Sequence, residues 1–372
     1  MSKLIYNKIT MIAPAQIANF GGLFDRAGKL CCRPPLGAYD AEGGPGNWMQ
    51  IERLSGKKGV IEVDILVRKC DADGFWDNPV TFSKLLDEIR QHPEKDVVRL
   101  LTQATCHKIA ELTDKPIQDG FRITIIIHTP NGQTGLGLGG SASSAAIVIG
   151  IDALYGSPIA DSNEGQKTLL RLAAEGERIA AGRIFFDNVA PLIVKGDLIY
   201  IPPTLTGEPN VFSLNCPPNL HVVTITPDFA ISTSHMTAVL KDKTVGWQTA
   251  ETAGDHKMEV MRALLTQDLN LLLKHATNTI IEPIRGQHIK GYKTAQSVVQ
   301  EMNANDPENP RYALGISGSG PTMYVMTGSI EEANQAGYEI HKALNEQEQV
   351  YSWWFCHSVN PNGAEVIGRE SH

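Results

Sequence analysis

The chain has 372 residues, a hydrophobic fraction of 42%, a charged fraction of 20% and a formal net charge of −8. It is long enough for two domains, and no stretch approaches the ~20 apolar residues of a membrane span. No basic run is present, so we expect neither nucleic acid nor a membrane as partner. The first residues lack an apolar leader and the cysteines form no C-x-x-C pair, so we predict a cytoplasmic protein with reduced thiols.

The first half of the chain predicts strands followed by helices. Short or alternating apolar runs indicate strands over residues 9–15, 60–65 and 121–129, and longer apolar stretches indicate helices over 141–154 and 164–181. The DNVAP segment at 187–191 is expected to end the second helix. Apolar runs at 192–194 and 198–201 around a Lys-Gly-Asp turn then predict a hairpin. The segment 36–99 carries no motif, and two interpretations of it stay open, a lid and a subunit contact.

The second half predicts a separate domain. The proline-rich stretch at 202–218 marks a boundary, so we divide the chain into residues 1–212 and 213–372. Strands and helices alternate after it, which favours an α+β half of ferredoxin-like type. Strands are expected over 220–226, 312–316, 322–326 and 350–357, and helices over 232–240, 256–277 and 330–344.

Acidic residues recur at alternate positions in the DADGFWD segment at 71–77. A calcium loop of the EF-hand type would continue with a third oxygen ligand before the glycine and a glutamate at its twelfth position. Neither is present here, so a solvated turn is the better interpretation.

A glycine-serine loop, GLGLGGSASS at residues 135–144, lies between a predicted strand and a predicted helix. Glycines allow backbone amides to turn toward a ligand, and the N-terminus of the following helix offers unpaired N–H groups to phosphate. The loop also satisfies the dinucleotide-binding pattern G-x-G-x-x-G. It is not, however, a tight strand-to-helix turn in a first βαβ unit, so we rank dinucleotide binding below phosphate binding by a kinase-type loop. No Gly-Lys-Ser/Thr follows, so it is not a P-loop.

A second glycine-rich run, GISGSGPT at residues 315–322, joins two predicted strands. A tight hairpin turn accounts for it in part. Its two serines and three glycines also allow backbone amides to approach the phosphate site from the second domain.

These motifs occur together in the order found in homoserine kinases, and the chain resembles that family of the GHMP kinase superfamily. Further matches along the chain are APAQIAN at 13–19, DNVAP at 187–191, TPDF at 226–229, EPIR at 282–285 and GAEV at 363–366. The resemblance implies an α+β fold with a β-rich N-terminal domain, a left-handed βαβ unit and a ferredoxin-like C-terminal domain. It also implies an active site between the two domains that uses ATP and Mg²⁺.

The resemblance assigns roles to individual residues. Asn188 would position the attacking hydroxyl, with Asp187 ranked below it. Ser141 and Glu177 would hold Mg²⁺, although an N-cap serine and a solvated helix glutamate are the simpler interpretations of these residue types. The residues expected to contact the nucleotide are Pro130, Gly135, Gly137, Gly139, Gly140, Ser141, Ala142, Ser143, Ser144, Gly318 and Ser319.

The acceptor site shows departures from the family pattern. Asn19 and Asp25 match residues that bind the amino-acid substrate, and Arg285 matches an arginine that grips its carboxylate. Phe185, however, stands where the family places a histidine, and Thr237 stands where it places a second arginine. Both substitutions make the pocket less polar.

We therefore predict phosphorylation of the hydroxyl of a small amino acid, with L-homoserine, and thus threonine biosynthesis, first. Another small hydroxylated acceptor such as threonine or a hydroxy acid, and a non-catalytic nucleotide-binding regulator, are the alternatives. The expected partner is a small molecule, and the oligomeric state stays open, a homodimer included.

Overall fold

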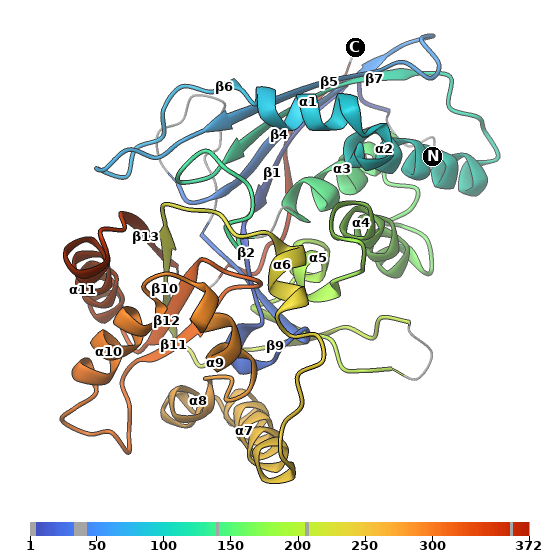
Figure 1. Ribbon diagram of the computed structural model, residues 1–372. Coiled ribbons are helices and arrows are strands. Elements are labelled where there is room, and N and C mark those ends of the chain that lie inside the picture. Colours follow the sequence, from blue (N-terminus) through green and yellow to red (C-terminus); the bar gives the residue numbers. More distant parts are fainter. Residues whose placement is uncertain (1–4, 33–42, 139–140, 205–207, 358–359, 372) are drawn as a thin grey trace.

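The computed structural model describes residues 5–32, 43–138, 141–204, 208–357 and 360–371. Within them, the first sheet has the strand order β14-β1-β4-β7-β5-β6 and forms the upper part of the molecule in Figure 1. Its named neighbours are antiparallel, except that β5 and β7 run parallel. The strands are β1 (Lys8–Pro14), β4 (Gly46–Leu54), β5 (Ile61–Arg68), β6 (Val80–Thr81), β7 (Gly120–His128) and β14 (Glu365–Glu370).

The connection from β5 to β7 is a βαβ crossover, as the resemblance implied. It contains β6, α1 (Ser83–Gln91) and α2 (Val97–Thr113), and α2 begins at Asp96, whose carboxylate accepts a 3.0 Å hydrogen bond from the backbone amide of Arg99. Such an N-cap contributes ~1 kcal/mol to the helix. The left hand of the crossover stays a prediction.

Helices α2, α3 (Ser141–Leu154) and α4 (Gly165–Ala181) cover one face of this sheet (Figure 1). Helix α3 is buried along most of its length because it is apolar on every side. Its residues Ala145, Ile147 and Ile151 are inaccessible to solvent and pack in one core with Met11 of β1 and Ile123 of β7. The predicted helix at 141–154 is confirmed, and its N-terminus follows the glycine-serine loop.

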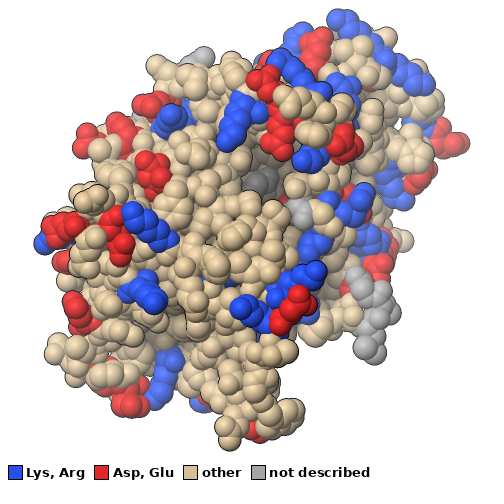
Figure 2. Space-filling view, in the orientation of Figure 1, with Lys and Arg blue, Asp and Glu red and all other residues tan. Residues whose placement is uncertain are grey.

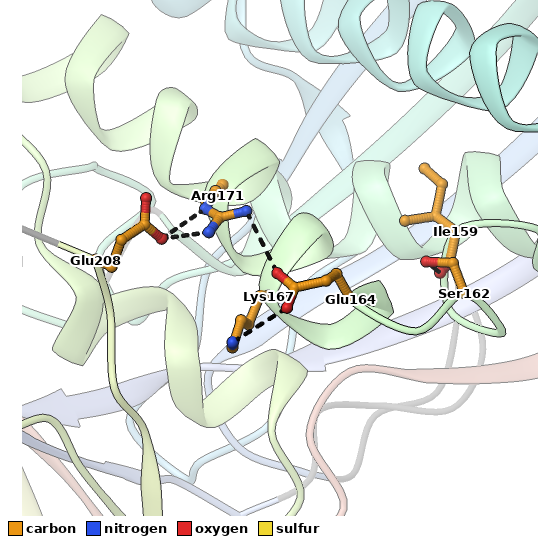
Figure 3. A network of polar contacts seen from close by, with 6 residues as sticks. All are labelled: Ile159, Ser162, Glu164, Lys167, Arg171 and Glu208. Carbon is orange, nitrogen blue, oxygen red and sulfur yellow. Dashed lines mark hydrogen bonds and ion pairs between the residues drawn. The ribbon is translucent and has the colours of Figure 1, made fainter.

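Surface ion pairs along α4 join this helix to the segment after β8 (Figure 3). The carboxylate of Glu164 lies 3.3 Å from Lys167 Nζ and 4.0 Å from Arg171 Nη1. Arg171 Nε in turn donates a 3.0 Å hydrogen bond to Glu208 Oε2. These side chains are about half exposed, so each pair contributes at most ~1 kcal/mol.

The second half of the chain forms the ferredoxin-like sheet that the alternation predicted. Its strand order is β11-β12-β10-β13, and the neighbours are antiparallel. The chain order is strand, helices, two strands, helix, strand, which is the ferredoxin-like topology. The strands are β10 (His221–Pro227), β11 (Ala313–Ile316), β12 (Met323–Thr327) and β13 (Ser352–His357).

Two helices, α10 (Tyr292–Met302) and α11 (Ile330–Glu348), pack against this sheet (Figure 1). The other helices between β10 and β11 are α6 (Thr233–Ala238), α7 (Trp247–Thr266), α8 (Leu269–His275) and α9 (Ile281–Arg285). The single helix predicted over 256–277 is wrong. Gln267 adopts a left-handed conformation (φ 56°) and ends α7, and the side chain of Asp268 then caps α8 by accepting from the Leu271 amide at 3.0 Å.

A smaller sheet has the strand order β2-β3-β8-β9. The predicted hairpin of residues 192–194 with 198–201 is wrong, because β8 pairs with β3 and β9 instead. Residues 186–193 form helix α5, where Val189, Ala190 and Leu192 share the buried side. The elements are β2 (Gln16–Ala18), β3 (Ala27–Leu30), α5 (Phe186–Ile193), β8 (Leu198–Tyr200) and β9 (Phe212–Leu214).

The chain crosses between its two parts more than once. Strand β14, near the C-terminus, pairs with β1 and so completes an edge of the first sheet. One hydrophobic cluster also combines Ile17 and Phe20 with Val260 and Tyr324 from the second half. The division into residues 1–212 and 213–372 stays a prediction, with the qualification that β14 lies in the first sheet.

The DADGFWD segment at 71–77 was expected to be a solvated turn. The DADGFWD segment is a turn, in which Asp71 Oδ1 accepts hydrogen bonds from the amides of Asp73 (3.0 Å) and Phe75 (2.8 Å). The Asp71 carboxylate therefore accepts hydrogen bonds from the backbone of its own turn.

Within the part of the chain that the structure describes, no helix combines the length and the apolar character needed to cross a bilayer.

Gly28 on β3 allows α5 to lie directly on the small sheet. A Cβ atom at this position would lie 2.1 Å from the Asp187 carbonyl oxygen and 2.7 Å from Pro191 Cγ. Gly28→Ala should therefore lower the free energy of unfolding by about 1–3 kcal/mol, because α5 has to shift. Urea denaturation measures this change.

Gly254 provides the matched control, since it lies in α7 and a Cβ there meets nothing within 4 Å. Gly254→Ala should stabilise the protein by roughly 0.5–1 kcal/mol. Equal effects of the two substitutions would contradict the close packing of α5 on β3.

Candidate active site

The glycine-serine loop begins where β7 ends. Pro130 is buried, and its carbonyl accepts a 2.9 Å hydrogen bond from the Cys70 amide, which fixes the start of the loop. Gly135 and Gly137 have positive φ angles of 79° and 76°, a conformation that favours glycine. Gly139 and Gly140 lie outside the described residues. The loop then enters α3 at Ser141.

The serines at the start of α3 have different partners. Ser141 Oγ donates a 2.6 Å hydrogen bond to Glu177 Oε1 on α4. The Ser143 hydroxyl is joined to the side-chain amide of Asn47 by a 2.7 Å hydrogen bond. Ser144 is packed against α4, where a Cβ on Gly176 would lie 2.2 Å from its Oγ. Of the three hydroxyls, that of Ser141 therefore lies beside the carboxylate.

Glu177 links the loop to α5. Its second oxygen, Oε2, accepts a 3.0 Å hydrogen bond from Asn188 Nδ2, so the predicted catalytic and metal-binding residues form one chain of contacts. Burial raises the pKa of Glu177 above its ordinary value, while the hydrogen bonds from Ser141 and Asn188 oppose this shift. A buried carboxylate with two neutral donors is a site that a cation would stabilise.

The second glycine run does form the turn between β11 and β12, and it also contacts the first loop. Ser317 Oγ donates to the Gly137 carbonyl at 2.6 Å, and the Thr322 amide donates to the Leu136 carbonyl at 3.1 Å. A Cβ on Gly137 would lie 2.5 Å from the Ser317 carbonyl oxygen. The two loops that were predicted to bind the nucleotide thus touch through their backbones.

Two residues that were predicted to bind the substrate are hydrogen bonded to the Gly318 carbonyl. It accepts hydrogen bonds from Asn19 Nδ2 at 2.9 Å and from Arg285 Nη1 at 2.6 Å. Asn19 has a left-handed backbone (φ 61°), and its Oδ1 accepts from the Asp25 amide at 2.7 Å. The loop 19–25 is therefore folded over the second glycine run. Ser319, beside Gly318, is hydrogen bonded to Thr233 of α6 at 3.3 Å.

Arg285 is a buried cation at the end of α9. Its guanidinium lies 4.9 Å from the ring centroid of Phe24, and its Nε has no hydrogen-bond partner among the described residues. Burial lowers the pKa of Arg285 to about 10, and the nearby charge of Asp25 opposes this shift. Together with Asn19 and Gly318 it lines a small pocket. This surface suits an anionic group of a ligand.

Asp187 is buried beside these residues, with Oδ1 unpaired among the described atoms. Burial, together with the negative charge of Asp25, raises the pKa of Asp187 to about 7. A carboxyl group with a pKa near neutrality can exchange a proton under physiological conditions.

Arg183 lies in the same cluster, and the sequence analysis missed it. Its Nη2 is 2.8 Å from Asp25 Oδ2 and its guanidinium lies 4.2 Å from the ring centroid of Phe185. Its position near the DNVAP segment was the available signal. Thr237 is half-buried on α6.

The site lies between the two parts of the chain, and Figure 2 shows that the face of Figure 1 is hollowed near its middle. Lys and Arg side chains lie around the hollow and are interspersed with acidic ones over the same face. Among the described residues, no group of three or more His, Cys, Asp or Glu side chains is arranged to hold a metal ion.

Comparisons with known proteins agree with this geometry. Residues 98–196 match the model of the GHMP kinases N terminal domain. The homoserine kinase of Chloroherpeton thalassium is 28% identical over 236 residues, which cover 62% of this chain and 68% of that protein. The homoserine kinase of Methanocella arvoryzae is 27% identical over 321 residues, covering 86% and 85% respectively. The structure of homoserine kinase from Cytophaga hutchinsonii has a TM-score of 0.74 at 24% identity and covers 97% of this chain and 98% of its own.

Residues 98–196 thus match the N-terminal domain of the GHMP kinases, and the fold is similar to that of the homoserine kinase structure. In sequence, the chain is similar to the two homoserine kinases named above.

Glu282, three residues before Arg285, gives a stability prediction. It is fully buried and accepts from the Asn278 amide at 3.3 Å and from the Tyr292 hydroxyl at 3.1 Å, and burial raises its pKa from 4.5 to about 8. A raised carboxyl pKa favours the folded state at low pH, and this contribution is lost as the pH rises from 4.5 through 8. Relative to Glu282→Gln, the wild type should therefore lose stability over that range, by ~1.4 kcal/mol per pH unit at most.

Urea unfolding of both proteins at pH 5, 7 and 9 measures this difference. Glu301→Gln, at an exposed position of α10, is the control and should give a flat difference. Parallel stability curves for wild type and Glu282→Gln would show that Glu282 does not titrate in this range.

Proposed function

We propose that this chain transfers the γ-phosphate of ATP, with Mg²⁺, to the hydroxyl of a small amino acid, and that L-homoserine is the leading candidate. The proposed product is O-phospho-L-homoserine, an intermediate of threonine biosynthesis, and we place the reaction in the cytoplasm. The observation that carries the proposal is the continuous chain of contacts from Ser141 through Glu177 to Asn188 at the start of α3. It lies where the glycine-serine loop meets the second glycine run.

The phosphate groups of ATP would lie on the loop at 135–144. The N-terminus of α3 and the backbone of the glycine loop favour negative charge by their dipoles and free amides. A local positive potential of this kind is needed because the protein as a whole has a net charge of −8. From the other side, Gly318 and Ser319 would approach the nucleotide. We retain Pro130, Gly135, Gly137, Ala142, Ser143 and Ser144 as neighbours of the phosphates.

The donor set at Glu177 fits Mg²⁺. A carboxylate and the Ser141 hydroxyl are hard oxygen ligands, and Mg²⁺ sites commonly use one or two protein carboxylates together with substrate phosphates. Burial raises the pKa of Glu177, so a cation beside this carboxylate would favour its ionised form. Bound Mg²⁺ would neutralise charge on the transferring phosphate.

Asn188 would orient the acceptor hydroxyl. Its Nδ2 is used by Glu177, which fixes the amide and leaves its oxygen to accept the hydroxyl proton as a hydrogen bond. Positioning of this kind supplies much of the catalysis in phosphoryl transfer. Asp187, with its pKa near 7, is the nearby group that could receive the proton as the new O–P bond forms.

The acceptor would lie between the 19–25 loop and α9. Arg285 is buried and cationic, so it would hold the substrate carboxylate, while Asp25 would attract an ammonium group. Asn19, bonded to Gly318, sets the position of this loop. The predicted domains, 1–212 and 213–372, would thus both contribute to the site.

A second acceptor class is favoured by a specific observation. The rings of Phe24 and Phe185 lie against Arg285 and Arg183, and Thr237 contributes no positive charge. Phe185 stands in place of a histidine and Asp25 is paired with Arg183, so the site offers less to an ammonium group, and a hydroxy acid is the alternative acceptor. A regulator without turnover is disfavoured, because the Ser141, Glu177 and Asn188 contacts are intact.

The direct test is a coupled assay of ATP-dependent phosphorylation on homoserine, threonine, serine and non-amino hydroxy acids. We expect homoserine turnover, and Asn188→Leu should reduce kcat by on the order of 10²-fold or more, because a hydrogen bond made in the transition state is lost. Its ATP affinity should be nearly unchanged.

Three results would go against the proposal. Near-normal kcat in Asn188→Leu would remove Asn188 from the reaction. Selective turnover of a non-amino hydroxy acid, with poor homoserine turnover, would replace homoserine by the second acceptor class. ATP binding without phosphorylation of any of these acceptors would favour the regulator.

A further inference from the structure

The carboxylate of Asp25 already has a cationic partner within the protein. Arg183 Nη2 lies 2.8 Å from Asp25 Oδ2. The same guanidinium lies over the ring of Phe185 at 4.2 Å from its centroid, a distance at which a cation is attracted to the face of an aromatic ring. Two neighbours thus hold Arg183 against the group that was expected to bind the ammonium of an amino-acid substrate.

Arg183 is placed so that its guanidinium can move away from Asp25. It lies in the short connection between α4 and α5, just after Gly182 ends α4 in a left-handed conformation. The side chains of Arg183 and Asp25 are 46% and 32% exposed, and ion pairs of this exposure are weak. A ligand ammonium can therefore compete with the guanidinium for Asp25.

The charges around the pair define what the site offers a ligand. Arg285 is buried, and its pKa is sensitive to the charges of Asp25, Arg183 and Asp187, which places these groups in one electrostatic cluster. With Arg183 on Asp25, the ion pair is internally neutral and Arg285 is left to attract an anion. That arrangement fits a hydroxy carboxylate that has no ammonium group.

We propose that Arg183 is a specificity-determining residue that competes with the acceptor's ammonium for Asp25 and so weakens discrimination in favour of amino acids. This inference rests on the proposed function and names a residue that sets its substrate class. Arg183 has no part in the phosphoryl transfer itself. Phe185 supports it by providing the ring on which the guanidinium rests.

Two acceptors that differ only in the amino group test this competition. They are L-homoserine and 4-hydroxybutyrate, which is homoserine without its amino group. In Arg183→Gln, kcat/KM for homoserine should rise by up to about fivefold, the factor that corresponds to ~1 kcal/mol for a half-exposed pair. The value for 4-hydroxybutyrate should not rise, because this acceptor has no ammonium group to take the place of the guanidinium on Asp25. In the Asp25→Asn background, Arg183→Gln should give no gain for homoserine, because the shared partner is absent.

Arg178→Gln is the matched control. Arg178 lies in the last turn of α4, is 59% exposed and pairs with Glu175 at 2.6 Å, so its removal should leave the ratio of the two kcat/KM values as in the wild type. An unchanged ratio in Arg183→Gln would overturn the inference. An equal loss for both acceptors would also overturn it, since Arg183 would then bind their common carboxylate. Failure of the wild type to phosphorylate either acceptor would instead remove the proposed function on which the inference rests.

Discussion

The backbone contact between the two glycine loops fixes the geometry of the whole site. Gly137 lies so close to the Ser317 carbonyl that a single added carbon would be 2.5 Å from that oxygen, and Ser317 Oγ donates back to Gly137. This contact holds Gly318 in place. The Gly318 carbonyl accepts hydrogen bonds from the side chains of Asn19 and Arg285. The glycine-serine loop, the loop 19–25 and the buried Arg285 therefore contact one another through the second glycine run, although they come from distant parts of the chain.

Buried charge is the second constraint. Glu177 and Asp187 are buried, which raises the pKa of both carboxyl groups, so a positive charge nearby would favour their ionised forms. Arg285 is buried with a lowered pKa. A ligand that brings a metal ion to Glu177 and an anion to Arg285 would relieve both penalties together. In this way a protein of net charge −8 would provide the anion site that we propose.

The sequence predicted much of this because glycine loops and short motifs report local backbone requirements. The start of α3 at Ser141 and the ferredoxin-like order of the second half follow from such patterns. Helix α5 could not be predicted as such, since its DNVAP segment contains a proline, and the close packing on Gly28 that favours it is tertiary. Arg183 was missed for the same reason: its partner Asp25 is 158 residues away, and periodicity carries no information about such contacts.

The central claim is that Glu177 is where a nucleotide and a metal ion meet, and titration calorimetry tests it directly. ATP binding is measured with and without Mg²⁺ for the wild type and for Glu177→Gln, after thermal unfolding has shown the variant to be folded. We predict that Mg²⁺ strengthens ATP binding to the wild type, and that Glu177→Gln loses most of this gain because its neutral amide is a poor metal ligand. The same gain in both proteins would contradict the assignment of Glu177 and with it the proposed phosphate site.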